Sequence, residues 1–370
     1  MFLRILFVLF LIAVIFLAQG FINPIPERKV DPNFKPQYGF SYSFEQAGWY
    51  GLDPRTDYLR LLDEFEFSWV RLPFFWDQTL LRSNQASEGQ VDDLNLDDLK
   101  FAIEEAKKRN VGVIVAIGAK VPYFPEYHWP KEIASKVKFG ERITINHPEA
   151  EEILEIDHKV VSELSQYDNI IYWQVENEPL IGNINKWKID PSLVSAEVEF
   201  VRNSDPQKRP VILNHAATGF YDKSWRSLLS ILKPGDVFAV NAFFKTKGKD
   251  LITAKIFGRE IHILWPNHLV WPVHSWLWLS PNYQSIKNQV EERGLKFWIL
   301  EMQAEPYIKK LEEADDSLLS FIPQDIKAAD NFLRSYQVES VGLWGVHFWQ
   351  FREKQGDNLW VGTAKEIVNN

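Results

Sequence analysis

The sequence predicts an α/β fold in which eight parallel strands, each followed by a helix, close into a single barrel. From Gln37 onward, eight short apolar runs alternate with amphipathic stretches, which is the pattern of parallel strands joined by helices. An open doubly wound sheet would instead carry a glycine-rich phosphate turn after its first strand, and Phe44–Gly48 is no such turn. No internal repeat is visible in the sequence. We therefore expect one domain, a (β/α)8 TIM barrel.

Each expected strand is a short apolar run that ends near polar or turn-forming residues. In chain order the strands are Tyr38–Ser43, Trp69–Phe75, Val111–Gly118, Ile170–Asn177, Pro210–His215, Val237–Phe243, Phe297–Leu300 and Val341–Phe348. Two of the helices between them are well marked. Pro54–Phe65 begins with a proline at a first helical position after Asp53, and apolar residues recur at three- and four-residue steps through Leu96–Arg109.

The N-terminus has the features of an export signal. Arg4 precedes an unbroken apolar run from Ile5 to Ala18, which is short for a transmembrane helix of about 20 residues. Small residues at Ala18 and Gly20 suit a signal peptidase. We expect residues 1–20 to be a signal peptide or signal anchor, residues 21–36, with four prolines, to be an extended linker, and residues 37–370 to be the barrel domain. The protein is then extracytoplasmic, either secreted or tethered to a membrane.

Composition and missing motifs exclude several function classes. The net charge of −9 and the dispersed Lys and Arg residues argue against nucleic acid as a partner. The absence of cysteine excludes disulfides, thiolate metal sites and cysteine nucleophiles. Neither a His-Glu-x-x-His metal motif nor a G-x-S-x-G nucleophile elbow occurs. We expect no metal and no cofactor. The 15 Trp residues suit either core packing or stacking on a flat ligand such as a sugar.

Two carboxylates follow expected strands at the end of the barrel where reactive groups gather. The fourth strand runs into Asn177-Glu178-Pro179, and the seventh runs into Glu301. Glycosidic cleavage needs one carboxyl group that is protonated and another that is ionised. When the two lie about 5 to 5.5 Å apart, the product retains its anomeric configuration. Glu178 and Glu301 are therefore candidates for the two catalytic groups of a retaining glycosidase.

At these residues the chain resembles the clan of retaining glycosidases with (β/α)8 barrels, which includes cellulase-like and mannanase-like families such as glycoside hydrolase family 5. The resemblance covers nearly all of residues 37–352. It implies that Glu178 is the acid/base, that Glu301 is the nucleophile and that Asn177 binds the sugar 2-hydroxyl group. It also implies that Arg71 hydrogen-bonds the nucleophile.

Further substrate contacts are expected around these groups. The resemblance places Trp344 and Trp349 in the region that floors the cleavage subsite. Aromatic residues follow the third strand, where His128 and Trp129 belong to a loop that can stack on sugar rings. A second cluster, Trp265, Trp271, Trp276 and Trp278, can wall the cleft, touch a membrane interface or pack as a loop core, and packing is favoured because leucines accompany it.

The sixth strand departs from the clan pattern. Clan members place a Tyr or His near its end to hydrogen-bond the nucleophile, whereas this chain has Asn241 followed by Ala242 and two Phe residues. That role is either missing or is taken by Asn241, His215 or His262. His215 and His347 lie at strand ends, where a histidine can contact substrate or be part of the core.

Structural interpretations of the same residues stay open. Glu178 beside Pro179 can simply stabilise a helix N-terminus, and Arg71 can be purely structural. Glu305 is the rival of Glu301, which is favoured because it follows the apolar run directly. Glu176 would share the face of Glu178 on an ideal strand and is expected to be a buried partner for a cation such as Arg71.

These observations predict a retaining O-glycosyl hydrolase that cleaves β-glycosidic bonds in a poly- or oligosaccharide, such as a β-glucan or β-mannan, by double displacement. One alternative is a transglycosylase on the same site, in which a sugar hydroxyl replaces water. A second is a catalytically silent carbohydrate-binding barrel, which would have no need for both Glu178 and Glu301. The sequence leaves the sugar, the linkage and the oligomeric state open.

Overall fold

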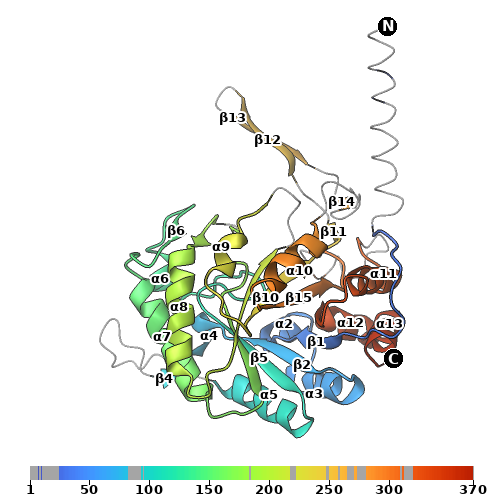
Figure 1. The fold of residues 1–370 in the computed structure, drawn as a ribbon, viewed down its shortest axis with the longest axis horizontal. Coiled ribbons are helices and arrows are strands. Elements are labelled where there is room, and N and C mark those ends of the chain that lie inside the picture. Colours follow the sequence, from blue (N-terminus) through green and yellow to red (C-terminus); the bar gives the residue numbers. More distant parts are fainter. Residues whose placement is uncertain are drawn as a thin grey trace.

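The computed structural model is a barrel of strands enclosed by helices (Figure 1). The structure describes residues 25–81, 93–94, 96–182, 185–216, 222–246, 250–256, 259–264, 271–272, 281–308, 311 and 320–369, together with positions 7 and 10. Most of the predicted export segment and most of the second Trp cluster lie outside these residues. Within the described part of the chain, no helix is both long enough and apolar enough to cross a bilayer.

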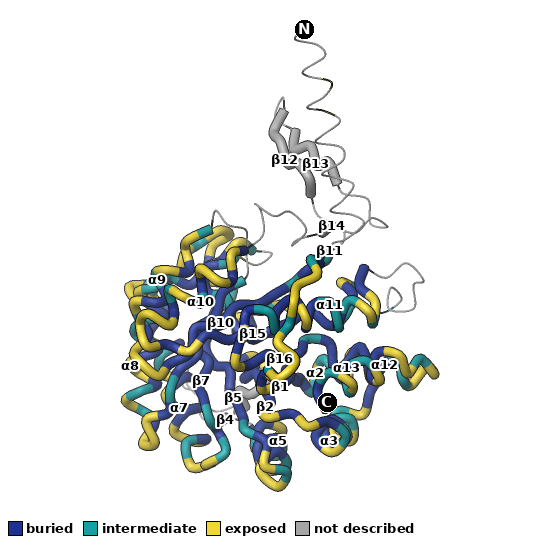
Figure 2. Tube along the Cα trace, turned by 45° about the vertical axis from the view of Figure 1, so that its right-hand side comes forward, coloured by how far each residue is buried: buried dark blue, intermediate teal, exposed yellow. Residues whose placement is uncertain are grey.

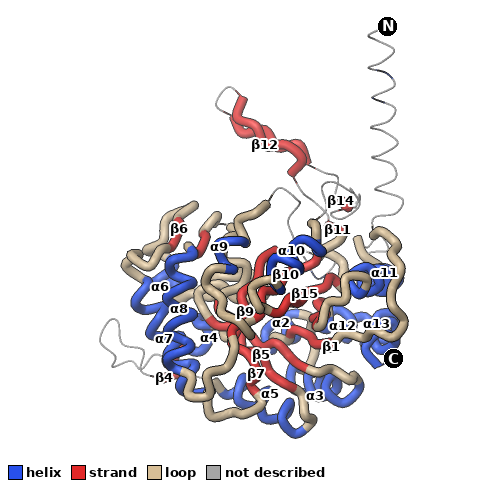
Figure 3. The backbone as a smooth tube through the Cα atoms, in the orientation of Figure 1, coloured by secondary structure: helices blue, strands red, loops and turns tan. Residues whose placement is uncertain are grey.

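Eight parallel strands form the closed barrel, and β1 pairs with both β2 and β16 to complete it. Around the barrel the order is β1 (Gln37–Ser41), β16 (Ser340–Trp344), β15 (Lys296–Gln303), β10 (Val237–Ala242), β9 (Val211–Ala216), β7 (Ile170–Val175), β5 (Gly112–Ile117) and β2 (Trp69–Pro73). Each of the eight strands coincides with one that the sequence predicts, so the (β/α)8 barrel is confirmed (Figure 3).

Helices cover the outside of the barrel. They are α2 (Phe44–Trp49), α3 (Pro54–Glu64), α4 (Trp76–Thr79), α5 (Asp97–Lys108), α6 (Lys131–Ala134), α7 (Ala150–Leu164), α8 (Pro191–Ser204), α9 (Arg226–Leu229), α10 (Tyr283–Glu291), α11 (Pro323–Arg334), α12 (Val346–Lys354) and α13 (Leu359–Asn369). The start of α3 is the predicted one, because the Asp53 side chain accepts a 2.9 Å hydrogen bond from the Thr56 amide and Pro54 needs no donor partner.

In the described part of the chain, four two-stranded sheets lie outside the barrel. They are β3 (Leu80–Leu81) with β4 (Asp93–Leu94), β6 (Arg142–Ile143) with β8 (Lys188–Ile189), β11 (Lys245–Thr246) with β14 (Trp271–Pro272), and β12 (Asp250–Ile256) with β13 (Arg259–Leu264). The last three of the eight residues predicted for the final barrel strand, Val346 to Phe348, instead begin α12. Gly345 ends the strand with φ of +141°, and a Cβ there would lie 2.9 Å from the Ala304 backbone.

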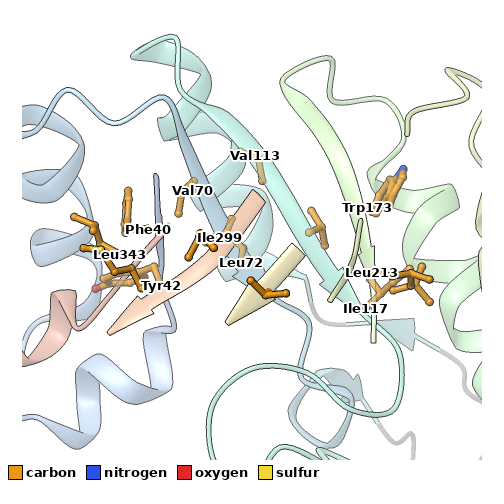
Figure 4. Close-up of a cluster of buried hydrophobic side chains, with 14 of the residues drawn as sticks. Phe40, Tyr42, Val70, Leu72, Val113, Ile117, Trp173, Leu213, Ile299 and Leu343 are labelled. Carbon is orange, nitrogen blue, oxygen red and sulfur yellow. The ribbon is translucent and has the colours of Figure 1, made fainter. Parts of the chain in front are cut away.

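Apolar side chains of the strands form two separate layers. Those that point outward pack against the helices, and Phe40, Val70, Leu72, Val113 and Leu213 are among them (Figure 4). Those that point inward fill the barrel near the strand N-termini, where the Trp69 and Trp298 rings stack with centroids 6.1 Å apart. The burial pattern shows the strands as an enclosed core with exposed positions on the surrounding helices (Figure 2). The inner layer closes one end of the barrel, so a site can form at the other end.

The described part of the predicted linker packs against the barrel domain. The Arg28 guanidinium lies 4.7 Å from the centroid of the Tyr336 ring, and Arg334 of α11 donates a 2.6 Å hydrogen bond to the Phe34 carbonyl. Ile25 is buried. Residues 25–36 form no helix or strand, and they lie against the helical layer.

Candidate active site

Strand alternation sets which residues face the space above the inner apolar layer. Trp69 faces inward, so Arg71 does as well, and Gln174, Asn214 and Asn241 occupy the corresponding inward positions of their strands. In β15 the register with β10 skips one residue, because Val240 pairs with Ile299 and Asn241 pairs with Glu301. This bulge turns Glu301 inward where simple alternation would turn it outward.

Asn241 links Glu178 and Glu301, because it contacts the first and lies next to the second. The Asn241 Nδ2 atom donates a 2.7 Å hydrogen bond to Glu178 Oε1, and the Asn241 backbone is the register partner of Glu301 in the neighbouring strand. Neighbouring strands lie about 4.8 Å apart, so Asn241 lies beside Glu301 while its side-chain amide binds Glu178. Glu301 is buried, whereas Glu178 is half-buried and reaches the opening of the barrel.

Arg71 holds Glu301. Its Nη2 atom lies 2.6 Å from Glu301 Oε1, its Nε donates to Ser41 Oγ at 2.8 Å, and its Nη1 donates to Gln174 Oε1 at 3.3 Å. The guanidinium has no exposed surface. A buried cation in contact with a carboxylate stabilises the ionised form, and three fixed hydrogen bonds leave the guanidinium one orientation.

A network of amide side chains connects this ion pair to Glu178. Gln174 Nε2 donates to Asn177 Oδ1 at 3.2 Å, and Asn214 Nδ2 donates to the same oxygen at 2.8 Å. Asn214 Oδ1 accepts from the Glu178 amide at 2.9 Å. Gln174 and Asn214 are not among the predicted site residues, and the signal for them in the sequence is polarity at inward strand positions where a plain barrel core would be apolar.

The two carboxyl groups differ in what opposes their protonation. Burial raises the pKa of Glu178 and the charge of Glu301 adds to the rise, while Lys120 and the Asn241 hydrogen bond oppose it. Burial also raises the pKa of Glu301, and Arg71 opposes that rise both by its charge and by its hydrogen bond. Glu301 has a cation in contact and Glu178 has a neutral amide, so the shared proton belongs on Glu178.

An aromatic wall and a third carboxyl group stand beside this pair. Trp344 is partly exposed, and the Tyr123 ring lies 4.5 Å from its ring, centroid to centroid. Hydrogen bonds with Trp344 and Tyr50 lower the pKa of Glu305, but burial outweighs them and raises it to about 8. Phe124, next to Tyr123, is 76% exposed. The opening is therefore lined by aromatic rings that a sugar can contact.

Arg71, Asn177, Asn241 and Trp344 are the predicted substrate-binding residues that the structure gathers around Glu178 and Glu301. The structure does not bring the other four of that set, His128, Trp129, His215 and Trp349, together with the two carboxyl groups, and they are buried among other side chains. His128 stacks on Phe75 with centroids 4.0 Å apart, and Trp129 packs between Tyr127 and Trp187.

His215 and Trp349 also lie outside this group of residues. His215 follows the inward Asn214 and so points outward, where its Nε2 lies 3.1 Å from Asp222 Oδ2. Trp349 lies in α12 and donates from Nε1 to the Ala304 carbonyl at 2.7 Å, inside the outer apolar layer. His347 is also buried, and burial lowers its pKa to about 3.

Glu176 does not pair with Arg71 as expected. The strand ends at Val175, and Glu176 takes a φ of +59°, so its side chain leaves the alternation of the strand. Its two oxygens accept hydrogen bonds from the backbone amides of Ala119 and Lys120, each at 2.7 Å. Among the described residues, the side-chain hydrogen bond to Glu301 comes from Arg71, and His262 lies in β13, where side chains are not described.

A family model described as cellulase, glycosyl hydrolase family 5, matches residues 30–241, which is more than half of the chain. The chain belongs to this family. As a family 5 member it is a glycoside hydrolase, and the match includes Arg71, Asn177 and Glu178. Among curated proteins, no sequence matches the chain.

Solved structures share the family 5 fold with this chain. GH5_18 from Streptomyces cattleya, in complex with GlcNAc, has a TM-score of 0.53 at 14% identity, over 84% of this chain and 70% of that one. A GH5-4 broad specificity endoglucanase from an uncultured bovine rumen ciliate has a TM-score of 0.55 at 15% identity, over 88% of this chain and 95% of that one. At such identities the similarity shows the fold alone.

Proposed function

We propose that this family 5 enzyme hydrolyses β-glycosidic bonds in a poly- or oligosaccharide with retention of configuration, with Glu301 as nucleophile and Glu178 as acid/base. The observation that carries the proposal is the asymmetric environment of the two carboxyl groups. Arg71 contacts Glu301 at 2.6 Å, whereas Glu178 is held by the neutral amide of Asn241 at 2.7 Å. One group is thereby kept ionised and the other can keep a proton.

Each step of a double displacement can be assigned to these atoms. A carboxylate oxygen of Glu301 attacks the anomeric carbon, and Glu178 gives its proton to the departing glycosidic oxygen. Once Glu301 is an ester it carries no charge, so the pKa of Glu178 falls and Glu178 stays ionised after it has given up its proton. The Glu178 carboxylate can then act as a base that accepts a proton from water. That water attacks the anomeric carbon and releases Glu301 as a carboxylate.

A β-glucan or β-mannan is the substrate class that we propose. The family model is described as a cellulase, and the first of the neighbouring structures holds GlcNAc while the second is described as an endoglucanase. Trp344 and Tyr123 beside Glu301 offer flat surfaces to the CH groups of a pyranose ring.

A panel of aryl β-glycosides and polysaccharides tests the proposal, with wild type and Glu301→Gln compared on every substrate. We expect wild type to cleave at least one member of the panel and Glu301→Gln to lose at least about a thousandfold in kcat/KM. The matched control is Glu305→Gln, which removes a carboxyl group from the same segment but not the expected nucleophile. If Glu301→Gln turns over normally, or if Glu305→Gln loses as much, the nucleophile is assigned wrongly.

We also propose that the enzyme is exported and acts outside the cytoplasm. The support is the apolar run from Ile5 to Ala18 after Arg4. Cell fractionation and N-terminal sequencing of the mature protein test it. A mature N-terminus near residue 21, or full-length enzyme in the membrane fraction, would agree with export, and full-length enzyme in the cytosol would contradict it.

A further inference from the structure

Resting on the proposed function, we infer that Glu176 is a positioning residue for the acid/base Glu178, and that it acts by tying the loop after β5 to the loop after β7. Glu176 lies two residues before Glu178 and is fully buried on the helix side of the barrel. It does not touch the space where substrate would bind. Its effect on the reaction would therefore pass through the backbone that carries Glu178.

Three hydrogen bonds of Glu176 and one of the neighbouring Asn177 join the chain after β7 to the chain at the end of β5. Its carboxyl oxygens accept from the Ala119 and Lys120 amides at 2.7 Å each. The Glu176 amide donates to the Ile117 carbonyl at 2.8 Å, and the Asn177 amide donates to the Lys120 carbonyl at 2.6 Å. The two loops thus continue the pairing of β5 and β7 beyond the ends of both strands.

These contacts stabilise a backbone that is otherwise unfavourable. Glu176 has φ of +59° and Glu178 has φ of +50°, in a region that side-chain-bearing residues rarely adopt. Two such residues in a row of three persist when their surroundings hold them. Gly118 fits the same arrangement, because a Cβ there would lie 2.6 Å from Glu176 Oε1. The close approach of the carboxyl group requires glycine at that position.

Lys120 carries the constraint to Glu178 itself. The amide of Lys120 binds Glu176, and its Nζ donates to the carbonyls of Glu178 and Ile181 at 3.0 Å each. The side chain is fully buried, and Nζ lies 3.5 Å from Glu126 Oε2. Displacing the Lys120 backbone would therefore move the ammonium group that holds the carbonyl of the acid/base.

Two further buried carboxyl groups surround Glu176, Asp157 from α7 and Glu197 from α8. Burial and the charge of Glu176 raise the pKa of both. Burial raises the pKa of Glu176 to about 7, while Glu197 and the two backbone amides favour its ionised form. Asp157 and Glu197 are then the neutral partners, and Glu176 is the acceptor for the backbone.

Substitution by glutamine distinguishes these roles. In Glu176→Gln one oxygen becomes an NH2 group that faces a backbone N–H, so one loop contact is lost. In Glu197→Gln the amide still offers a donor to Glu176, so the arrangement is kept. Asp330→Asn is the matched control, since Asp330 is a buried carboxyl group on α11 that binds Tyr38 at 2.7 Å near the other end of the barrel.

The leaving group provides a readout that a merely structural role would not move. A glycoside with a poor leaving group needs the proton of Glu178 to form the glycosyl-enzyme, whereas a dinitrophenyl glycoside of the same sugar does not. The measurement is kcat/KM on both substrates, with the melting temperature of each variant. We expect Glu176→Gln to lose about tenfold to a hundredfold on the oligosaccharide and less than about threefold on the dinitrophenyl glycoside.

Glu197→Gln and Asp330→Asn should keep the wild-type ratio between the two substrates. Equal losses of Glu176→Gln on both substrates, or no loss on either, would overturn the inference. If Glu176→Gln does not fold, Glu176→Asp decides by the same ratio, because the shorter side chain keeps the carboxyl group but cannot reach both backbone amides. If wild type cleaves neither substrate, the proposed function has failed instead, so the two failures are distinguishable.

Discussion

The side-chain amide of Asn241 donates a 2.7 Å hydrogen bond to Glu178 Oε1, and its backbone pairs with Glu301 in the adjacent strand. One residue of β10 therefore touches one catalytic candidate and lies next to the other. The hydrogen bond favours the ionised form of Glu178, whereas burial and the charge of Glu301 favour the protonated form. The balance among these effects sets the pH range in which Glu178 can act as an acid.

Asn241→Asp should move the basic limb of the pH profile of kcat/KM to higher pH. The substitution replaces a donor by a negative charge beside Glu178, so the pKa of Glu178 rises further, and activity is lost only when pH exceeds that pKa. Asn282→Asp, at the N-cap of α10, adds the same charge away from the site and should leave the limb in place. A limb that moves to lower pH in Asn241→Asp would refute this role.

Arg71→Met should raise the pKa of Glu301 and cost both activity and stability. Glu301 would remain buried without a cation, so the acidic limb of kcat/KM should move to higher pH. Breaking a buried ion pair in this way costs about 3–5 kcal/mol of unfolding free energy. Urea unfolding and the pH profile measure the two effects, and an unchanged acidic limb would show that Arg71 does not hold the nucleophile ionised.

Phe124→Ala should weaken binding of long glycans without affecting short ones. Phe124 is 76% exposed on the loop after β5, next to the ring of Tyr123 that contacts Trp344. Losing one stacked ring costs about 0.5–1.5 kcal/mol, which raises KM for a polysaccharide about two- to tenfold. An aryl monosaccharide should be cleaved as before. Phe139→Ala, with a ring 71% exposed elsewhere, is the control. Equal effects of both substitutions would count against a Phe124 subsite.

Glu305→Gln should change how stability depends on pH. The pKa of Glu305 is raised from about 4.5 to about 8, so the folded state favours its protonated form. The contribution of protonated Glu305 to the free energy of unfolding is fully present below pH 4.5 and is lost as pH rises through 8. Melting temperatures at pH 5 and pH 8 should therefore differ less in Glu305→Gln than in wild type. If the variant keeps the wild-type difference in melting temperature, the group that titrates between pH 5 and pH 8 is not Glu305.

The barrel could be predicted from the sequence because its two hydrophobic layers require the observed pattern of short apolar runs that alternate with amphipathic stretches. Each strand needs apolar side chains on both faces near its N-terminus, which gives continuous apolar runs such as residues 113–117 of β5. The apolar pattern does not show where the last strand ends. Apolar residues continue from Leu343 into Trp349, and the change from strand to helix depends on the positive φ of Gly345.

The positions of Glu178, three residues after β7, and of Arg71, inside β2, could be predicted from the bounds of those strands. The site could not be predicted where a local irregularity reverses the direction of a side chain. In β9 the inward residue is Asn214 and not the predicted His215, because the alternation that begins at the inward Ile212 continues to Asn214. Glu301 faces inward through a bulge, and Glu176 faces outward through a positive φ. Such backbone features depend on neighbouring strands.

Trapping of the glycosyl-enzyme with a 2-deoxy-2-fluoro β-glycoside tests the central claim most directly. The fluorine slows hydrolysis of the ester, so the covalent intermediate of a retaining enzyme accumulates on its nucleophile. Peptide mass spectrometry should find one added glycosyl group, on the peptide that contains Glu301, and none in Glu301→Gln. A label on another carboxyl group, or an initial product of inverted configuration from a substrate that wild type cleaves, would contradict the mechanism.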